Sequence, residues 1–358
     1  MRLRNLFFAL LSSCSTLLGA QDTLLLFHPT VYNLELIESL RQKEVINLEG
    51  YHVLGVFHTR EAYNYEPAFK KVAENPDAGF SLVEIKGELQ AGALYESNQC
   101  TDLFEELFKI SKGALFMGGP DIPPVLYNEP VHLLTRVSDP FRHYLETSFI
   151  FHLLGGKQDG HWIPWLDSKE QYLLSGICLG MQSMNVATGG TMIQDIPTEV
   201  YGIWNAEDVL KMPADQMHRN YTDMVENDCG SYTSYHFHQV SLTKGSFLQK
   251  DLKFKSKTAP LVLSSHHQAI EDPGKGWEIS ASSMDGKIIE AIEHENYPHV
   301  FGVQFHPEKP GLFDPDIIHP MSCDKQISFH EEIKDGDSFT FHMAYWDYLG
   351  RILQKARK

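Results

Sequence analysis

Apolar and polar positions are grouped along the chain in blocks that predict strands followed by helices. Short apolar runs at 23–29, 51–58 and 80–85 are typical of buried strands. The segments 34–45 and 100–111 instead place their apolar residues at helical spacing. Strands that alternate with helices predict βαβ units. The first half of the chain therefore predicts a mostly parallel sheet with helices on both faces, a three-layer α/β fold.

The second half of the chain follows this pattern less regularly. Strands are predicted at 234–242 and 261–270, and three more, joined by glycine-containing turns, within 276–308. The stretch 309–337 is rich in Pro, Asp and His, and we expect it to be a surface insertion. An amphipathic segment at 338–356 with basic residues at its end predicts a closing helix.

The N-terminus has the layout of a secretory signal peptide. Arg2 and Arg4 precede an apolar run at 6–20, which ends in small residues and is short for a membrane span. The sequence therefore predicts a signal peptide at 1–20, one folded domain at 21–358, no integral span after processing, and a secreted or periplasmic protein. A buried N-terminal strand is the alternative interpretation.

Composition narrows the class of partner. The chain is 42% hydrophobic and 22% charged, which is ordinary for a folded protein, and its formal net charge is −17. Because a strongly acidic protein repels polyanions, nucleic acid and an anionic membrane surface are not expected as partners. Composition leaves the oligomeric state open, with a homodimer among the alternatives.

Cysteine usage leaves several interpretations open. Spacing along the chain matches no zinc motif and no dense disulfide framework. Cys14 follows a lipobox-like sequence, so lipid anchoring is a second route of export. If Cys178 is reserved for chemistry, at most one disulfide forms among the remaining three, and its pairing stays open. These three are Cys100, Cys229 and Cys323.

The stretch SGICLGMQ, residues 175–182, is the first candidate for catalysis. A strand that leads through Gly-x-Cys-x-Gly into a helix is the sulfur version of a nucleophile elbow. Gly176 and Gly180 permit the tight turn, and the helix N-terminus favours the thiolate of Cys178. The N–H of Leu179 is then placed to donate to a developing oxyanion. A buried cysteine in an ordinary turn is the alternative.

Two further motifs supply what a thiolate nucleophile needs. QFHPE places His306 and Glu308 two residues apart, as a base and its orienting carboxylate. ALFMGGPD ends a predicted strand in Gly118-Gly119, where exposed backbone N–H groups suit an oxyanion hole. Taken singly, these motifs are also consistent with a surface turn and a tight turn.

Together the motifs resemble the class I glutamine amidotransferase superfamily. Within it the chain is most similar to the γ-glutamyl hydrolase branch, peptidase C26, which includes γ-glutamyl-γ-aminobutyrate hydrolase. The resemblance runs from about residue 114 to 309. The matching segments are GICLGMQ (176–182), GGPDIPPVLY (118–127), NVATGGTMIQDIP (185–197), SSHHQAI (264–270) and EAIEHENYPHVFGVQFHPEK (290–309). Three stretches depart from it as insertions, namely 155–170, 208–240 and 309–337.

The resemblance implies a flavodoxin-like fold, with the site at the carboxyl edge of the parallel strands. It also implies a role for each matching residue. The nucleophile is Cys178, the general base is His306 and its orienting group is Glu308. The oxyanion donors are the N–H groups of Gly119 and Leu179, and Gln182 holds the glutamyl group of the substrate. His267 and Gln268 line the pocket or, alternatively, bond a nearby loop.

The function implied is that of an exported cysteine hydrolase. It would cleave γ-glutamyl amide bonds of a small substrate through a glutamyl thioester, with no metal and no organic cofactor. A glutaminase subunit that supplies ammonia to a synthase is an alternative, as is a non-catalytic binding protein of the same fold. His236 and His238 share one face of a predicted strand, but no third ligand is apparent. A metal site is therefore not predicted.

Overall fold

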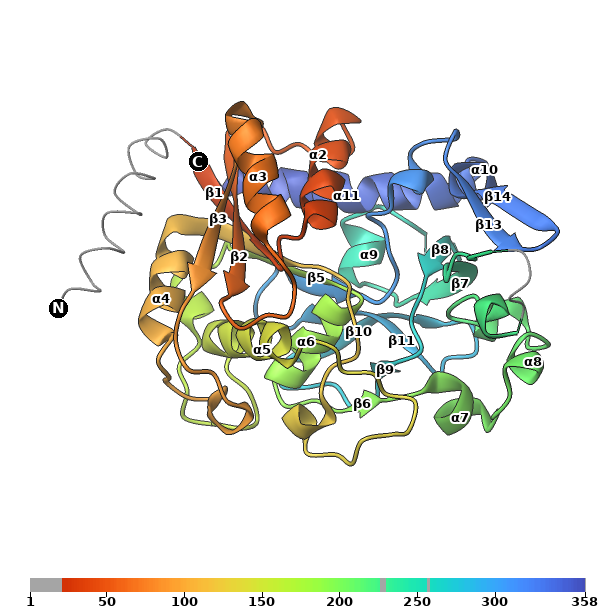
Figure 1. Cartoon of the computed structure of the whole chain (residues 1–358), viewed down its shortest axis with the longest axis horizontal. Coiled ribbons are helices and arrows are strands. Elements are labelled where there is room, and N and C mark those ends of the chain that lie inside the picture. Colours follow the sequence, from red (N-terminus) through yellow and green to blue (C-terminus); the bar gives the residue numbers. More distant parts are fainter. Residues whose placement is uncertain (1–20, 226–229, 256–257, 358) are drawn as a thin grey trace.

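The computed structural model describes residues 21–225, 230–255 and 258–357. The predicted signal peptide at 1–20, Cys14 and Cys229 lie outside these residues. A ten-stranded sheet runs through the centre of the molecule, in the order β3-β2-β1-β4-β5-β12-β11-β10-β7-β8 (Figure 1). The three-layer α/β fold predicted from the sequence is confirmed.

The first six strands in this order are parallel to one another. The chain builds β1, β2 and β3 outward in one direction, and then returns to place β4 on the other side of β1. Since all six point the same way, their carboxyl ends meet at one edge of the sheet. These strands are β3 (Phe80–Ile85), β2 (Tyr51–His58), β1 (Asp22–Phe27), β4 (Ser111–Phe116), β5 (Leu173–Ile177) and β12 (Val300–Val303).

The remaining four strands extend the sheet in antiparallel fashion, each pairing with its neighbour in opposite direction. β12 is therefore the boundary strand, parallel to β5 on one side and antiparallel to β11 on the other. The antiparallel strands are β11 (Ile289–His294), β10 (Trp277–Ser283), β7 (His236–Leu242) and β8 (Leu261–Ser264).

Side chains of β1 show why both faces of the sheet are covered. Leu24 and Leu26 belong to one apolar cluster, and Leu25 and Phe27 belong to the other. Because successive side chains of a strand point to opposite faces, an unbroken apolar run needs a helical layer on each side. The first cluster lies against α2 (Val31–Gln42), α3 (Glu66–Glu74) and α11 (Asp337–Ala356), and the second against α4 (Thr101–Ile110), α5 (Pro140–Leu154) and α6 (Leu179–Ala187) (Figure 1).

The predicted insertions carry short elements of their own. The 309–337 stretch forms a two-stranded hairpin and a short helix, which project at one end of the molecule (Figure 1). The short strands and helices of the chain, both inside and outside the predicted insertions, are β6 (Met192–Ile193), α7 (Ile196–Tyr201), α8 (Ala206–Val209), α9 (Phe247–Lys250), β9 (Ala269–Ile270), β13 (Ile318–Ser322), β14 (Lys325–Ser328) and α10 (Phe329–Ile333).

One predicted strand is wrong in its extent. The 261–270 segment is not continuous, because β8 stops at Ser264 and β9 begins at Ala269 in a different sheet. Between them the backbone carbonyl of Gln268 accepts a hydrogen bond from Nδ1 of His266 at 2.9 Å. Apolar periodicity could not detect this break, because the residues between the strands are held by polar contacts that lie inside the protein.

The described cysteines divide into two kinds. Cys100 and Cys178 are buried free thiols, whereas Cys323 is part of a disulfide. No helix in the described part of the chain is both long and apolar enough to cross a bilayer.

Candidate active site

Cys178 lies in the sharp turn between β5 and α6, with φ 53° and ψ −108°. Its N–H donates to the carbonyl of Val303 on β12 at 2.8 Å, which holds the turn against the neighbouring strand. The two flanking glycines are required by contact. A methyl group at Gly176 would lie 2.4 Å from the carbonyl carbon of Gly180, and one at Gly180 would lie 2.2 Å from the oxygen of Phe116. The sequence therefore produces a strained elbow that presents the sulfur above the sheet edge.

His306 follows β12 at the same edge of the sheet, and its ring is oriented from several sides. Its Nδ1 donates to Oε1 of Glu308 at 2.7 Å, which leaves Nε2 free to face the cysteine that lines the same pocket. The ring of Tyr235 packs edge-on against it, with the two ring centroids 5.3 Å apart. The indole of Trp346 donates to the carbonyl of Pro307 at 2.9 Å and fixes the turn between base and carboxylate.

The charges of the site reinforce one another. Burial alone would lower the pKa of His306, but the negative charges of Glu308 and Cys178 raise it to about 9. Burial alone would raise the pKa of Glu308, but His306 and Lys309 lower it to about 2. The Lys309 ammonium lies 3.1 Å from Oε1 of Glu308 and contributes to that effect. The arrangement therefore favours an imidazolium at His306, held against the carboxylate of Glu308.

Arg142 on α5 orients the glycine loop that faces the nucleophile. Its Nη2 donates to the carbonyls of Met117 at 2.7 Å and Gly118 at 3.1 Å, and its Nε donates to Glu146 Oε1 at 2.8 Å. Because a trans peptide directs its C=O and N–H to opposite sides, the N–H of Gly119 points away from the guanidinium. Both members of the ion pair are buried, at 2% and 0% exposure of their side chains.

Two backbone N–H groups are thus available beside the sulfur. One is that of Gly119, which makes no backbone hydrogen bond to any other described residue. The other is that of Leu179, the first residue of α6 and so one of the free donors at a helix N-terminus. Donors of this kind stabilise the oxyanion of a tetrahedral intermediate.

A pocket of about 400 Å³ opens over these groups. It is lined by residues from the carboxyl ends of β1, β4, β5 and β12 and by two segments from the later half of the chain. Its lining comprises His28, Thr30, Tyr32, Asn33, Met117, Gly118, Gly119, Pro120, Arg142, Cys178, Tyr235, Ser265, His306, Glu308 and Lys309. The structure thus brings Cys178, His306, Glu308 and the Gly118-Gly119 loop, all singled out by the sequence motifs, into one pocket. Their catalytic roles stay predictions.

Sequence reasoning missed Arg142, Glu146, Lys309 and Tyr235. The first two had a signal, because an Arg and a Glu four residues apart in a predicted helix share one face. Helical spacing does not say which neighbour that face contacts, so the burial of the pair and its contact with the glycine loop needed the tertiary structure.

The residues expected to bind substrate have other partners in the structure. The amide of Gln182 donates to the carbonyl of Gln268 at 3.3 Å and to Oε1 of Gln304 at 3.2 Å, and it is buried beside the elbow. His267 lies between two carboxylates, with Nε2 at 3.0 Å from Asp121 and Nδ1 at 3.0 Å from Asp195. His267 thereby connects the glycine loop to the segment after α6. Its role as a loop contact is visible, and roles toward substrate stay predictions.

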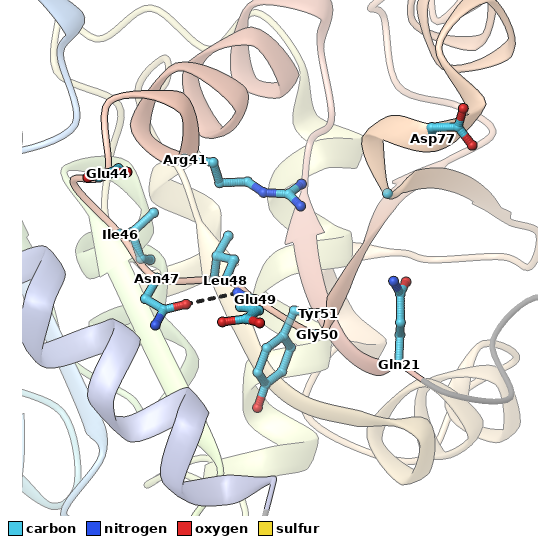
Figure 2. Close-up of a pocket in the computed structure, with 11 residues that line it drawn as sticks. Gln21, Arg41, Glu44, Ile46, Asn47, Leu48, Glu49, Gly50, Tyr51 and Asp77 are labelled. Atoms are coloured by element: carbon cyan, nitrogen blue, oxygen red, sulfur yellow. Dashed lines mark hydrogen bonds between the residues drawn. The ribbon is translucent and has the colours of Figure 1, made fainter.

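A larger cavity of about 580 Å³ lies at the opposite edge of the sheet, where β2 and β3 begin (Figure 2). Arg41, Glu49 and Asp77 contribute charges to it, and the N–H of Glu49 donates to Asn47 at 3.0 Å. The guanidinium of Arg41 is already held by the carbonyl of Ala78 at 2.9 Å. No thiol is among its described lining residues, so it does not compete with the site of Cys178 as a candidate active site.

Comparison with known proteins places the chain in a family. Residues 91–308 match the family model of peptidase C26. The chain is 28% identical over 209 residues to protein NtpR of Enterococcus hirae, which covers 56% of this chain and 71% of that protein. It is 33% identical over 192 residues to a Mycobacterium tuberculosis protein provisionally named as a glutamine amidotransferase. This match covers 54% of this chain and 49% of that protein. It is 28% identical over 156 residues to the CTP synthase of Methylorubrum populi. This match covers 41% of this chain and 28% of that protein.

Proposed function

This chain belongs to the peptidase C26 family, and from that premise we propose that it is a cysteine hydrolase that cleaves γ-glutamyl amide bonds. The observation that carries the proposal is the convergence of Cys178, His306 and Glu308 in the lining of the 400 Å³ pocket, with Nδ1 of His306 held by Glu308. A thiolate, a protonated imidazole and two oxyanion donors are the groups that acyl transfer from an amide requires.

The first half of the reaction forms an acyl-enzyme. The thiolate of Cys178 attacks the γ-carbonyl carbon, and the carbonyl oxygen becomes an oxyanion held by the N–H groups of Gly119 and Leu179. As the C–N bond breaks, Nε2 of His306 gives its proton to the leaving amine. The products of this half are the free amine and a glutamyl thioester.

The second half releases glutamate. The neutral His306 removes a proton from water, and the resulting hydroxide attacks the thioester carbon. The C–S bond breaks and the thiolate re-forms beside the imidazolium. Glu308 keeps its negative charge throughout and holds Nδ1–H, so Nε2 always faces the reacting atoms.

The pocket has ionisable groups of both signs in its lining. Arg142, Lys309 and protonated His306 are its cations, whereas Glu308 and the proposed thiolate are its anions. Arg142 is paired with Glu146, and Lys309 and His306 are paired with Glu308. A γ-glutamyl group carries both an α-ammonium and an α-carboxylate, so a polar pocket with charges of both signs suits it better than an apolar one.

The direct test compares two cysteine variants. Cys178→Ala should abolish glutamate release from a panel of γ-glutamyl amides, whereas Cys100→Ala should retain it, because Cys100 is buried on the far side of the sheet core. Burial raises the pKa of Cys100 to about 11, so a thiol-reactive electrophile at neutral pH should label Cys178 and not Cys100. Glutamate release by Cys178→Ala at the parent rate would refute the proposal. An unreactive Cys178 would point to a non-catalytic binding protein.

A second candidate function is that of a glutaminase that supplies ammonia to a partner synthase. The match to a CTP synthase favours it, because that protein's name describes a synthase. Turnover of free glutamine by the isolated chain and copurification of a second subunit would support it. Preference for larger γ-glutamyl amides with no copurifying subunit would favour the hydrolase.

We also propose that the protein is exported. The charged and apolar pattern of residues 1–20 supports this, and so does the disulfide at Cys323, because disulfides persist in oxidising compartments. Fractionation of cells that produce the full chain, followed by mass measurement of the mature N-terminus, distinguishes cleavage after Ala20 from lipidation at Cys14. Full-length protein retained in the cytosol would contradict both.

A further inference from the structure

A second cluster of functional side chains lies outside the catalytic machinery. Four buried ligand groups from separate parts of the chain converge so that their ligand atoms all lie within 4.8 Å of one another. Each of these side chains is at most 1% exposed. The members of this His3Glu cluster are His218, His238, His266 and Glu290. We propose that the His3Glu cluster is a binding site for a divalent transition metal ion, with Zn²⁺ as the best match to its ligands.

Two of the three distances from Glu290 to the histidines are longer than a hydrogen bond, and the third pair does not meet hydrogen-bond geometry. Oε1 of Glu290 lies 3.0 Å from Nδ1 of His218, 3.7 Å from Nε2 of His238 and 3.9 Å from Nε2 of His266. Four ligands at ordinary zinc distances form a tetrahedron with edges of about 3.3 Å. The three distances from Glu290 bracket this value, and the ligand atoms all lie within 4.8 Å of one another, so side-chain movements of this size would bring them to coordination distance.

Several ligand atoms have no other partner. Both carboxylate oxygens of Glu290, both ring nitrogens of His218 and Nε2 of His266 are buried without a hydrogen bond to any described residue. Burying an unpaired carboxylate is expensive, and so many unpaired polar atoms rarely gather in one place. A cation at the centre would satisfy the facing lone pairs together.

The outer nitrogens of two histidines are held as metal ligands usually are. Nδ1 of His266 donates to the carbonyl of Gln268 at 2.9 Å, and Nδ1 of His238 donates to the carbonyl of Gln239 at 3.1 Å. These contacts fix the tautomer that leaves each Nε2 with its lone pair toward Glu290. The hydroxyl of Ser264 now lies 2.8 Å from Nε2 of His238 and would rotate away when a metal binds.

The protonation state agrees with the geometry. Burial lowers the pKa of His218 and His238 to about 4, and that of His266 to about 3. All three are therefore neutral at physiological pH and present lone pairs. Three imidazoles with one carboxylate suit Zn²⁺ over hard cations such as Mg²⁺ or Ca²⁺, which prefer oxygen ligands.

The His3Glu cluster joins four separate segments of the chain beside the catalytic pocket. His238 lies on β7, His266 follows β8, and Glu290 lies on β11, while His218 belongs to the loop that precedes β7. The N–H of His266 also donates to the carbonyl of His218 at 3.0 Å. Ser265, next in sequence to His266, lines the catalytic pocket. With four protein ligands the site has no open coordination position, so the metal is structural. It would crosslink the strands and the loop that supply its ligands, next to the lining of the catalytic pocket.

The structure also explains why the sequence did not predict this site. Sequence reasoning considered His236 together with His238. In the structure Nε2 of His236 instead contacts the carbonyl of Ala214 at 3.1 Å. The remaining ligands come from positions 218, 266 and 290, which no spacing motif connects.

The test is metal analysis of the purified full chain after incubation with Zn²⁺ and dialysis. We expect about one ion per chain, and roughly a tenth of that in His266→Ala and Glu290→Gln. His236→Ala is the matched control and should keep the metal, because it removes a neighbouring histidine that is outside the cluster. Co²⁺ in place of Zn²⁺ should give the visible absorption of a tetrahedral complex.

Two outcomes would overturn the proposal. One is a parent protein that retains no metal and whose melting temperature is the same with and without a chelator, as expected if the cluster merely shares a proton. The other is equal metal loss in His236→Ala. Glu290→Gln is nearly isosteric, so it keeps the test decisive if an alanine variant fails to fold. Metal content is measured independently of activity, so the result does not depend on the proposed hydrolase function.

Discussion

The guanidinium of Arg142 donates to the carbonyl oxygen of Gly118 at 3.1 Å, across 24 residues of sequence. This contact orients the peptide whose other end is the Gly119 N–H. The proposed oxyanion donor is therefore positioned by a side chain on α5, which is in turn held by Glu146. The proposed catalytic geometry thus depends on a buried ion pair that does not touch the reacting atoms.

Arg142→Met should lower kcat by roughly ten- to a hundredfold with little change in KM, since losing an oxyanion donor outright costs about 10²–10³. The variant also leaves Glu146 buried without its partner, at a cost of about 3–5 kcal/mol in unfolding free energy. The double variant Arg142→Met/Glu146→Leu separates the two effects. It should regain stability while kcat stays low, as measured by steady-state kinetics and urea unfolding. Recovery of kcat in the double variant would contradict a positioning role.

The pH dependence of kcat/KM should report His306. Because its pKa is raised to about 9, the imidazolium that protonates the leaving amine persists across neutral pH, and kcat/KM should fall only as pH rises through about 9. Glu308→Gln removes a negative charge that favours the imidazolium. The alkaline limb should then move to lower pH, along with a lower maximal rate. If the alkaline limb of the kcat/KM profile is at the same pH in Glu308→Gln as in the parent, a group other than His306 controls that limb.

His267 should make stability depend on pH. Burial alone would lower its pKa, but Asp121 and Asp195 raise it from 6.5 to about 9. A group with a raised pKa in the folded state contributes stability fully below its unfolded pKa of 6.5 and loses that contribution as pH rises through about 9.

The variant His267→Gln isolates this effect. The parent should exceed it in unfolding free energy by roughly 2 kcal/mol at pH 6, after allowance for partial exposure, and the difference should vanish near pH 10. Urea unfolding at a series of pH values measures it. A difference that stays constant with pH would show that the two ion pairs do not control it.

Gly180→Ala should damage the elbow, because the added methyl group would lie 2.2 Å from the backbone oxygen of Phe116. Relief requires a shift of β4 against α6, at a cost of about 1–3 kcal/mol or more. Gly92→Ala is the matched control, since nothing lies within 4 Å of its added methyl group. The melting temperature and the rate of glutamate release should both fall in Gly180→Ala and stay at the parent level in Gly92→Ala. Equal behaviour of the two variants would argue against tight packing at the elbow.

The sequence predicted those parts of the site that depend on local order. The elbow around Cys178, the Gly118-Gly119 turn and the HPE segment each follow a predicted strand, and parallel strands bring such ends together. Contacts made across the fold could not be predicted in this way. The orientation of Gly119 by Arg142 and the convergence of the His3Glu cluster both require the spatial arrangement of elements. The same holds for the break between β8 and β9, where buried polar contacts rather than apolar spacing end the strand.

The position of β12 has a consequence for how this protein could diversify. β12 pairs in parallel with β5, which leads to the nucleophile, and antiparallel with β11, where the extension of the sheet begins. The stretch 208–240 runs into β7, and the stretch 309–337 lies between β12 and α11, so neither interrupts β5 or the turn that follows it. Lengthening those stretches could therefore alter which leaving groups are accepted, while Cys178 and its strand are inherited unchanged.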